Sequence, residues 1–135
     1  MADSPEDQEL ADRYRRYNAL CNAHDFDGLG EFVAEAIRVN DEPVGLTAYA
    51  AGLTEVVVAF PDYHWRIRHL VVNSPLVAAH FTDTGTHRGG PFLGVAATGR
   101  SVQVDEFAVY AWRDGRITEV WVASDRLAAL DQLRR

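Results

Sequence analysis

The apolar residues of this chain change their spacing at Pro61, and this change constrains the fold more than any other feature. Before Pro61 they mostly recur every three or four residues, which is the period of an amphipathic helix. After Pro61 they alternate with polar residues or form runs rich in valine and aromatic residues, which is typical of strands. Helices followed by strands along one chain predict an α+β fold.

The part before Pro61 predicts three helices and one short strand. The first helix is expected over residues 4–22, because a serine can cap it and an apolar stripe recurs along it at helical spacing. A turn at 25–28 leads into a short second helix, and a short strand is expected at 37–40. The third helix is expected over 45–60, where the following proline stops the next turn.

The part after Pro61 predicts antiparallel strands and a closing helix. Residues 73–75 and 113–115 are turn sequences, so the strands on either side of each should pair as hairpins. The expected elements are strands at 65–72, 76–87, 101–112 and 116–123 and a helix at 124–133.

Together these elements predict a single α+β domain over residues 1–135. A curved antiparallel sheet of about four to six strands would form a cone. The three N-terminal helices would pack on its concave face, and a short helix would close the chain. The mouth of such a cone is a natural pocket for a small molecule.

All 13 basic residues are arginines, so the chain contains no lysine. A Schiff-base aldolase, a pyridoxal enzyme and a Walker-type phosphate loop each need a lysine, and these classes are excluded. The formal net charge is −7. Proteins that bind nucleic acid usually carry a basic patch, so we expect no nucleic-acid partner.

The sequence offers no signature of a metal or cofactor site. Cys21 is the only cysteine, which excludes an intrachain disulfide and a cysteine metal cage. The histidines form no HxH or HExxH motif, and no GxGxxG leads from a strand into a helix. The start does not resemble a signal peptide, and no apolar run approaches the length of a membrane span. We expect a cytoplasmic protein without metal, cofactor or membrane partner.

Glu106 is a candidate for acid/base chemistry because it is the only acid among apolar residues on one face of its predicted strand. Burying an acid without a partner is costly, so such a residue is usually paired or functional. The other face of this strand is also partly apolar. A shift of register would therefore place Glu106 at the surface instead.

Asp125 lies where the last strand passes into the last helix. In one interpretation Ser124 caps this helix and Asp125 occupies its first turn. In the other, Asp125 shares a strand face with Glu119, Trp121 and Ala123. If that face lines the pocket, the carboxyl at its end could act as a general acid/base, with a pKa raised by burial.

His87 is the third candidate. It shares a predicted strand face with Asp83, and the two could pair. The alternative is an ordinary histidine that makes hydrogen bonds without a catalytic role.

Four segments, in the same order, resemble the SnoaL-like polyketide cyclases. Gly85-Thr86-His87-Arg88-Gly89 is similar to their GTHxG motif, and residues 114–125 are similar to their DGKIxExWxxxD element. Residues 17–29 resemble their first helix-turn-helix, and 127–133 resemble their closing segment. This resemblance implies the cone-shaped α+β fold of scytalone dehydratase and ketosteroid isomerase. It also implies a homodimer or homotetramer packed through the outer face of the sheet.

The resemblance further implies an aspartate that acts as acid and base, without metal or Schiff base, at the position of Asp125. The ring-closing members pair this aspartate with a histidine on the preceding strand. Counting back from the Asp-Gly turn places that histidine at Ala108, so it is missing here. Glu106 lies two residues away on the same face and could be the second acid/base group.

The sequence therefore predicts a cofactor-independent enzyme of polyketide-type secondary metabolism that cyclises or isomerises an apolar, polyketide-like molecule in a buried pocket. Asp125 would transfer protons, while Glu106 and His87 would polarise or orient the substrate. The residues expected to line the pocket are Trp65, Tyr49, Trp121, Tyr17 and Ala108.

Two alternatives remain open. Without the histidine, a relative on the same fold could open epoxides, dehydrate or hydroxylate. A non-catalytic module that binds a small molecule is the other alternative, since a fold does not fix a function. A pocket filled by its own side chains, with Asp125 facing solvent, would favour the binding module.

Overall fold

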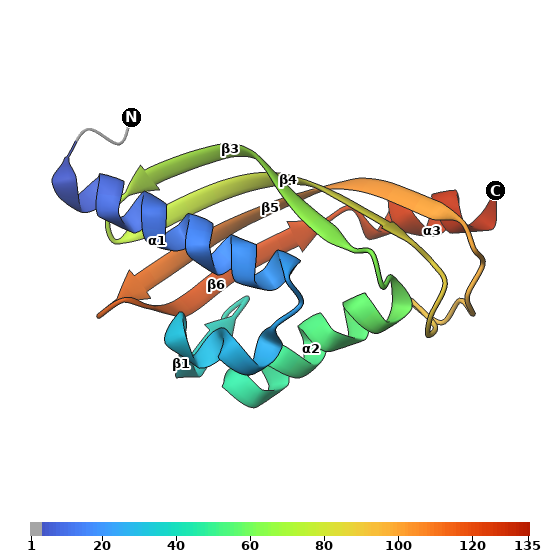
Figure 1. Cartoon of the computed structure of the whole chain (residues 1–135), viewed down its shortest axis with the longest axis horizontal. Helices are drawn as coiled ribbons and strands as arrows, with labels where there is room; N and C mark the ends of the chain where they lie inside the picture. Colours follow the sequence, from blue (N-terminus) through green and yellow to red (C-terminus); the bar gives the residue numbers. More distant parts are fainter. Residues whose placement is uncertain (1–3) are drawn as a thin grey trace.

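The α+β prediction is confirmed by a computed structural model that describes residues 4–135, in which a curved six-stranded sheet covers the N-terminal helices (Figure 1). The elements are α1 (Pro5–Asn22), the 3-10 helix η1 (Phe26–Glu31), β1 (Val33–Val39), β2 (Glu42–Pro43), α2 (Leu46–Ala59), β3 (His64–Asn73), β4 (Leu76–Thr86), β5 (Ser101–Arg113), β6 (Arg116–Ser124) and α3 (Arg126–Arg134).

The sheet has the strand order β2-β1-β6-β5-β4-β3. From β3 to β6 it is the predicted antiparallel meander, whereas β1 pairs with β6 in parallel. The predicted strand at 37–40 is only the second half of β1. A register shift between Val33 and Arg38 interrupts the ladder, so the first half of β1 shows no regular alternation that the sequence could reveal.

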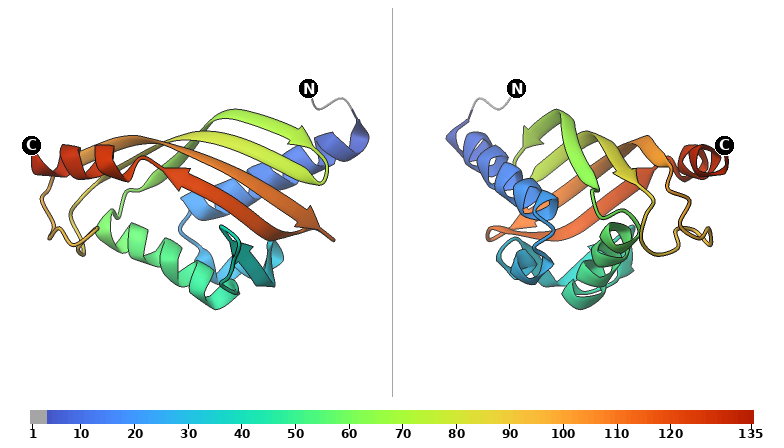
Figure 2. Two further views of the ribbon diagram at one scale, coloured as in Figure 1. Left: turned by 180° about the vertical axis from the view of Figure 1, so that it is seen from behind. Right: turned by 45° about the vertical axis from the view of Figure 1, so that its right-hand side comes forward.

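Helix α1 begins as predicted, with the side chain of Ser4 accepting a hydrogen bond from the backbone N–H of Asp7 at 3.0 Å. Its apolar stripe, which includes Tyr14, Tyr17 and Cys21, is buried under the concave side of the sheet. Figure 2 shows α1 and α2 under that side, while α3 lies at one end of the sheet beside β5. The main core is therefore enclosed between the sheet and the first two helices.

The two faces of the sheet are assigned by burial and by strand register. Alternate residues of β5, from Val102 to Trp112, face the helices, and their partners on β6 include Val120 and Val122. The face that carries Trp121 is the outer one, because Trp121 pairs with the outward-facing Val109. The side chains of β6 alternate between the two faces as expected, but the face that carries Trp121 points away from the core.

The loop between β4 and β5 is attached to the end of α2. The N–H groups of Gly89 and Gly90 donate to the carbonyls of Ala59 and Val58, at 3.0 and 3.2 Å. A methyl group added at Gly89 would lie 1.6 Å from the Val58 carbonyl oxygen, so only glycine fits this contact.

Helix α3 protects an unpaired part of β5. Strand β6 ends opposite Glu106, which leaves the backbone of Gln103 without a strand partner on that side. The side-chain amide of Gln132 takes that place, because its Oε1 accepts from the Gln103 N–H at 2.7 Å and its Nε2 donates to the Gln103 carbonyl at 2.9 Å. Over residues 4–135, no helix combines the length and apolar character needed to cross a membrane.

Candidate functional site

A cavity of about 110 Å³ lies between the concave face of the sheet and helices α1 and α2. Aromatic and apolar side chains form most of its wall, and within residues 4–135 Glu106 is the only acid that lines it. The lining residues are Tyr14, Tyr17, Asn18, Cys21, Tyr49, Leu53, Trp65, Phe81, Glu106, Tyr110, Val120 and Val122.

Glu106 reaches this cavity because it lies on the inward side of β5, paired with Phe81 of β4. The sequence alternation predicted this side, and the structure has no register slip in the ladder between β4 and β5. A carboxylate in this place can reach a substrate bound in the cavity and accept a proton from it.

Three tyrosines around the cavity are neutral hydroxyl groups. The hydroxyls of Tyr17 on α1 and Tyr49 on α2 share a hydrogen bond of 2.6 Å. Burial raises the pKa of Tyr17, Tyr49 and Tyr110 well above the usual value for tyrosine. They can therefore donate hydrogen bonds to a developing oxyanion without losing their protons at neutral pH.

Trp65 and Cys21 complete the wall in different ways. Asn22 holds the backbone of Trp65 at the start of β3: its Oδ1 accepts from the Trp65 N–H at 2.8 Å, and its Nδ2 donates to the Trp65 carbonyl at 3.0 Å. Burial raises the pKa of the Cys21 thiol to about 12, so this cysteine is not a thiolate nucleophile at neutral pH.

A second carboxyl, Asp83, lies behind Glu106. It is fully buried on β4, and its Oδ2 accepts a hydrogen bond from the Tyr63 hydroxyl at 2.9 Å. Burial, together with the neighbouring Glu106, raises the pKa of Asp83 to about 10. Sequence reasoning considered Asp83 only as a partner of His87. The sequence signal that could have placed Asp83 on the inward face is its spacing of two residues from Phe81 on the same strand.

His87 is placed away from the cavity lining. It is fully buried, its Nε2 is 2.9 Å from the Gly90 carbonyl, and its ring stacks on Phe60 with centroids 5.1 Å apart. The pairing of His87 with Asp83 that the sequence left possible is not formed: Asp83 accepts from Tyr63, and the His87 ring nitrogens face Gly90 and Thr98. In the structure, His87 fixes the start of the loop between β4 and β5.

Asp125 is exposed and caps α3 itself, so the expectation that Ser124 is the cap was wrong. Its Oδ1 accepts from the backbone N–H of Ala128 at 2.9 Å. Asp125 does not line the interior cavity. Of the expected pocket residues, Tyr17, Tyr49 and Trp65 line it, Ala108 is buried beside it on the inner face, and Trp121 lies on the outer face.

The cap predicts a difference between two variants of Asp125. D125A removes the acceptor for the Ala128 N–H and should lower the free energy of unfolding by about 1 kcal/mol. D125N keeps a good capping side chain and should cost less than about 0.5 kcal/mol. Urea unfolding of both variants measures this. Equal losses would show that the charge of Asp125, and not its hydrogen bond, stabilises the helix.

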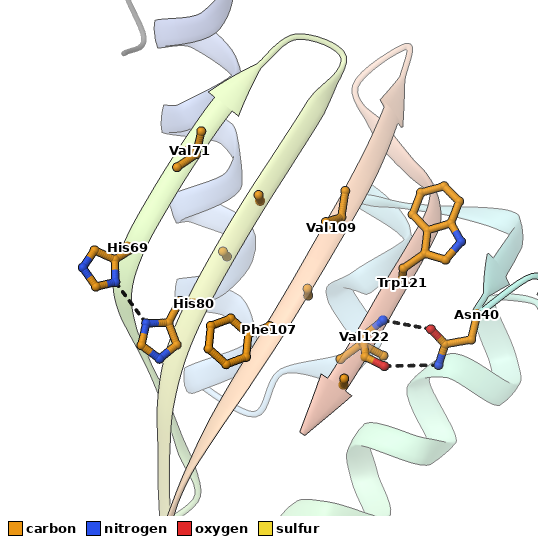
Figure 3. A pocket seen from close by; sticks show the side chains of 12 residues that line it. Asn40, His69, Val71, His80, Phe107, Val109, Trp121 and Val122 are labelled. Carbon is orange, nitrogen blue, oxygen red and sulfur yellow. Dashed lines mark hydrogen bonds between the residues drawn. The ribbon is translucent and has the colours of Figure 1, made fainter. Parts of the chain in front are cut away.

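A larger hollow, about 460 Å³, lies on the outer face of the sheet (Figure 3). It is an open groove lined mostly by apolar side chains, with His69 and His80 at one side and Trp121 at the other. The two histidines approach with their Nδ1 atoms 3.0 Å apart, and His80 Nε2 is 2.8 Å from Asp105 Oδ1. Among the described residues that line this groove there is no carboxyl, and the groove is open to solvent.

No set of three or more His, Cys, Asp or Glu side chains within residues 4–135 is arranged to hold a metal ion. The cavity offers one carboxyl on its wall, Glu106, and several neutral hydroxyls, with Asp83 next to Glu106 on the neighbouring strand. These groups can remove a proton from a substrate and stabilise the anion that results.

Comparison with known proteins gives a consistent result. The family model described as SnoaL-like polyketide cyclase matches residues 11–133. A crystal structure of a SnoaL-like polyketide cyclase from Agrobacterium tumefaciens is 31% identical, with a TM-score of 0.82, and the match covers 92% of this chain and 97% of that one. No curated protein matches the sequence.

Two Streptomyces structures are also similar. IdmH from Streptomyces antibioticus, described as a candidate polyketide cyclase, is 26% identical with a TM-score of 0.82, covering 93% of this chain and 98% of that one. AclR from Streptomyces galilaeus, described as a candidate hydroxylase, is 23% identical with a TM-score of 0.84, covering 95% of this chain and 97% of that one. The likeness to AclR concerns the fold alone.

Proposed function

The chain belongs to the SnoaL-like polyketide cyclase family, and from this premise we propose that it is a cofactor-independent acid/base enzyme acting on an apolar, polyketide-like molecule. The observation that carries the proposal is the position of Glu106. Among the described residues it is the only acid on the wall of a cavity that is otherwise largely aromatic and apolar, and a second carboxyl, Asp83, neighbours it on β4.

In the proposed reaction, Glu106 removes a proton from a carbon next to a carbonyl group. The carbon–hydrogen bond breaks, an O–H bond forms on Glu106, and the charge moves to the carbonyl oxygen as an enolate. The hydroxyls of Tyr17 and Tyr49 are hydrogen-bonded to each other, and the one that accepts in that bond donates its own proton in a hydrogen bond to the enolate oxygen. In a cyclisation the enolate carbon forms a bond to the carbon of a second carbonyl, and the oxygen of that carbonyl takes the proton from Glu106. In an isomerisation Glu106 returns the proton to another carbon of the enolate system.

The size of the cavity limits what enters it. About 110 Å³ holds the reacting end of a substrate, of the size of one small ring, and the rest of the molecule would remain near the mouth. The apolar wall formed by Trp65, Phe81 and Tyr110 favours a ring over a charged group.

Deuterium exchange into cyclohexanone tests the proposal without knowledge of the natural substrate. In D₂O at neutral pH, the protein should catalyse incorporation of deuterium at the carbons next to the carbonyl, followed by proton NMR. Saturation-transfer NMR on the same sample reports whether the ketone is bound. Bound ketone with exchange no faster than in buffer would overturn the proposal.

The second candidate function is a non-catalytic module that binds a small molecule on the same fold. Two observations favour it: Asp125 faces solvent as a helix cap, and aromatic side chains reduce the cavity to about 110 Å³. Binding of cyclohexanone without exchange is the result that this candidate predicts.

We also propose that two or more copies of the chain associate through the outer groove, as the family resemblance implies. Val71 and Phe107 in this groove are 59% and 56% exposed, and exposed apolar patches of this kind mark interfaces. F107E should therefore dissociate the oligomer into single chains in multi-angle light scattering. L127E, at an 80% exposed leucine on α3, is the matched control and should keep the oligomer. A wild-type protein that is already a single chain would contradict this.

A further inference from the structure

We propose that Asp83 is a positioning residue that keeps its proton and uses it to donate a hydrogen bond to the Glu106 carboxylate, which holds that carboxylate toward the cavity. This inference rests on the proposed function of Glu106 as the base. It can be tested without any substrate, which separates its failure from the failure of that function.

The geometry of the sheet brings the two carboxyls together. Asp83 on β4 pairs with Val104 on β5, and Glu106 lies two residues further along β5 on the same inner face. The two residues are therefore diagonal neighbours in an antiparallel ladder, within reach of long side chains.

The hydrogen bonds of Asp83 leave one oxygen without a donor. Its Oδ2 accepts from the Tyr63 hydroxyl, but its Oδ1 is fully buried and receives no hydrogen bond from any described residue when both carboxyls are ionised. A buried unpaired oxygen costs free energy. A proton on Oδ1 turns this atom into a donor toward the neighbouring Glu106 carboxylate, and both groups are then satisfied.

The charges around the pair favour one proton on it. Two adjacent carboxyls on a poorly solvated wall cannot both ionise at low cost. The groups that interact with the pair are acids, hydroxyls and a thiol. They are Tyr63 just before β3, Asp105 and Tyr110 on β5, Tyr14 and Cys21 on α1, and Tyr49 on α2.

Burial decides which carboxyl keeps the proton. Asp83 is fully buried, whereas Glu106 is partly exposed on the cavity wall. The charged form is most costly on the residue with the least access to water, so Asp83 is the member that keeps the proton. The raised pKa of Asp83, about 10, agrees with this order.

A proton on Asp83 has a consequence for stability that depends on pH. An unfolded Asp has a pKa near 3.9, and the folded value is raised, so the folded protein binds more protons than the unfolded chain between about pH 4 and pH 10. The contribution of Asp83 to the free energy of unfolding is complete below pH 4 and is lost as the pH rises toward 10. The unfolding equilibrium constant should rise by up to tenfold per pH unit from about pH 5 to 9.

D83N is the variant that isolates this effect. The asparagine can accept from the Tyr63 hydroxyl through its oxygen and donate to Glu106 through its amide, but it does not titrate. In urea unfolding between pH 5 and 9, the unfolding equilibrium constant should rise less steeply with pH in D83N than in the wild type. The difference should be up to a factor of ten in that constant per pH unit. Equal slopes would overturn the proposal.

Infrared spectroscopy of the folded protein tests the proton directly, and in the wild type it does not depend on any variant folding. At pH 8 the wild type should show the C=O stretch of one protonated carboxyl, which D83N lacks and E106Q retains. Absence of the band in the wild type, or its loss in E106Q with retention in D83N, would overturn the assignment. A band present in a protein that does not exchange cyclohexanone protons would contradict the proposed function alone.

Discussion

The E106Q variant should lose proton exchange on cyclohexanone by about 100-fold or more, because glutamine cannot accept the proton that the carboxylate removes. Glutamine is nearly the same size and lies on the same wall, so the variant should fold and still bind the ketone. The rate of deuterium incorporation measures the first effect, and saturation-transfer NMR measures binding.

D125N distinguishes Glu106 from the residue to which the family resemblance assigns the same role. Asp125 caps α3 at the surface and does not line the cavity, so D125N should keep the exchange rate within a few-fold of the wild type. The opposite pattern, a loss in D125N with activity kept in E106Q, would assign the acid/base role to Asp125 and remove it from Glu106.

The largest effect on stability is expected at Gly89. The G89A methyl group would lie 1.6 Å from the carbonyl oxygen of Val58. The methyl is fixed to the backbone of residue 89 and the oxygen belongs to the backbone, so neither atom can rotate away. Relief requires the loop after β4 to separate from the end of α2, which breaks the hydrogen bonds from Gly89 and Gly90. We expect a loss of about 3 kcal/mol in the free energy of unfolding, measured by urea unfolding.

G90A is the matched control, because it changes the next glycine of the same loop. Its methyl group would meet only a side-chain methyl of Val58 at 3.3 Å, which can shift. The expected cost is below about 1 kcal/mol. If G89A and G90A cost the same, the close approach between the loop and α2 does not stabilise the fold.

The helices and the meander could be predicted from the sequence because each has a local cause. Ser4 and Pro5 mark the start of α1, Pro61 follows the end of α2, and two turn sequences define the hairpins. The parallel pairing of β1 with β6 could not be predicted in the same way. It joins segments far apart in the chain, and an irregularity in β1 hides its alternation.

The faces of β6 were harder to predict because both sides of the sheet are apolar. Phe107, Val109 and Trp121 form an outer surface that resembles a core in the sequence pattern, so periodicity alone did not show which side faces the cavity. Glu106 is on the side that the alternation favoured. Asp83 was missed as its partner because the sequence does not give the register between β4 and β5, which brings the two residues together.

The side chain of Gln132 has a consequence for the behaviour of the protein at high concentration. By bonding both backbone groups of Gln103, it occupies the strip of β5 that β6 leaves uncovered. Such open strips are where a strand from another molecule can add and start a fibril or an aggregate. The side-chain amide of Gln132 thus prevents these backbone groups of β5 from pairing with a strand of another molecule.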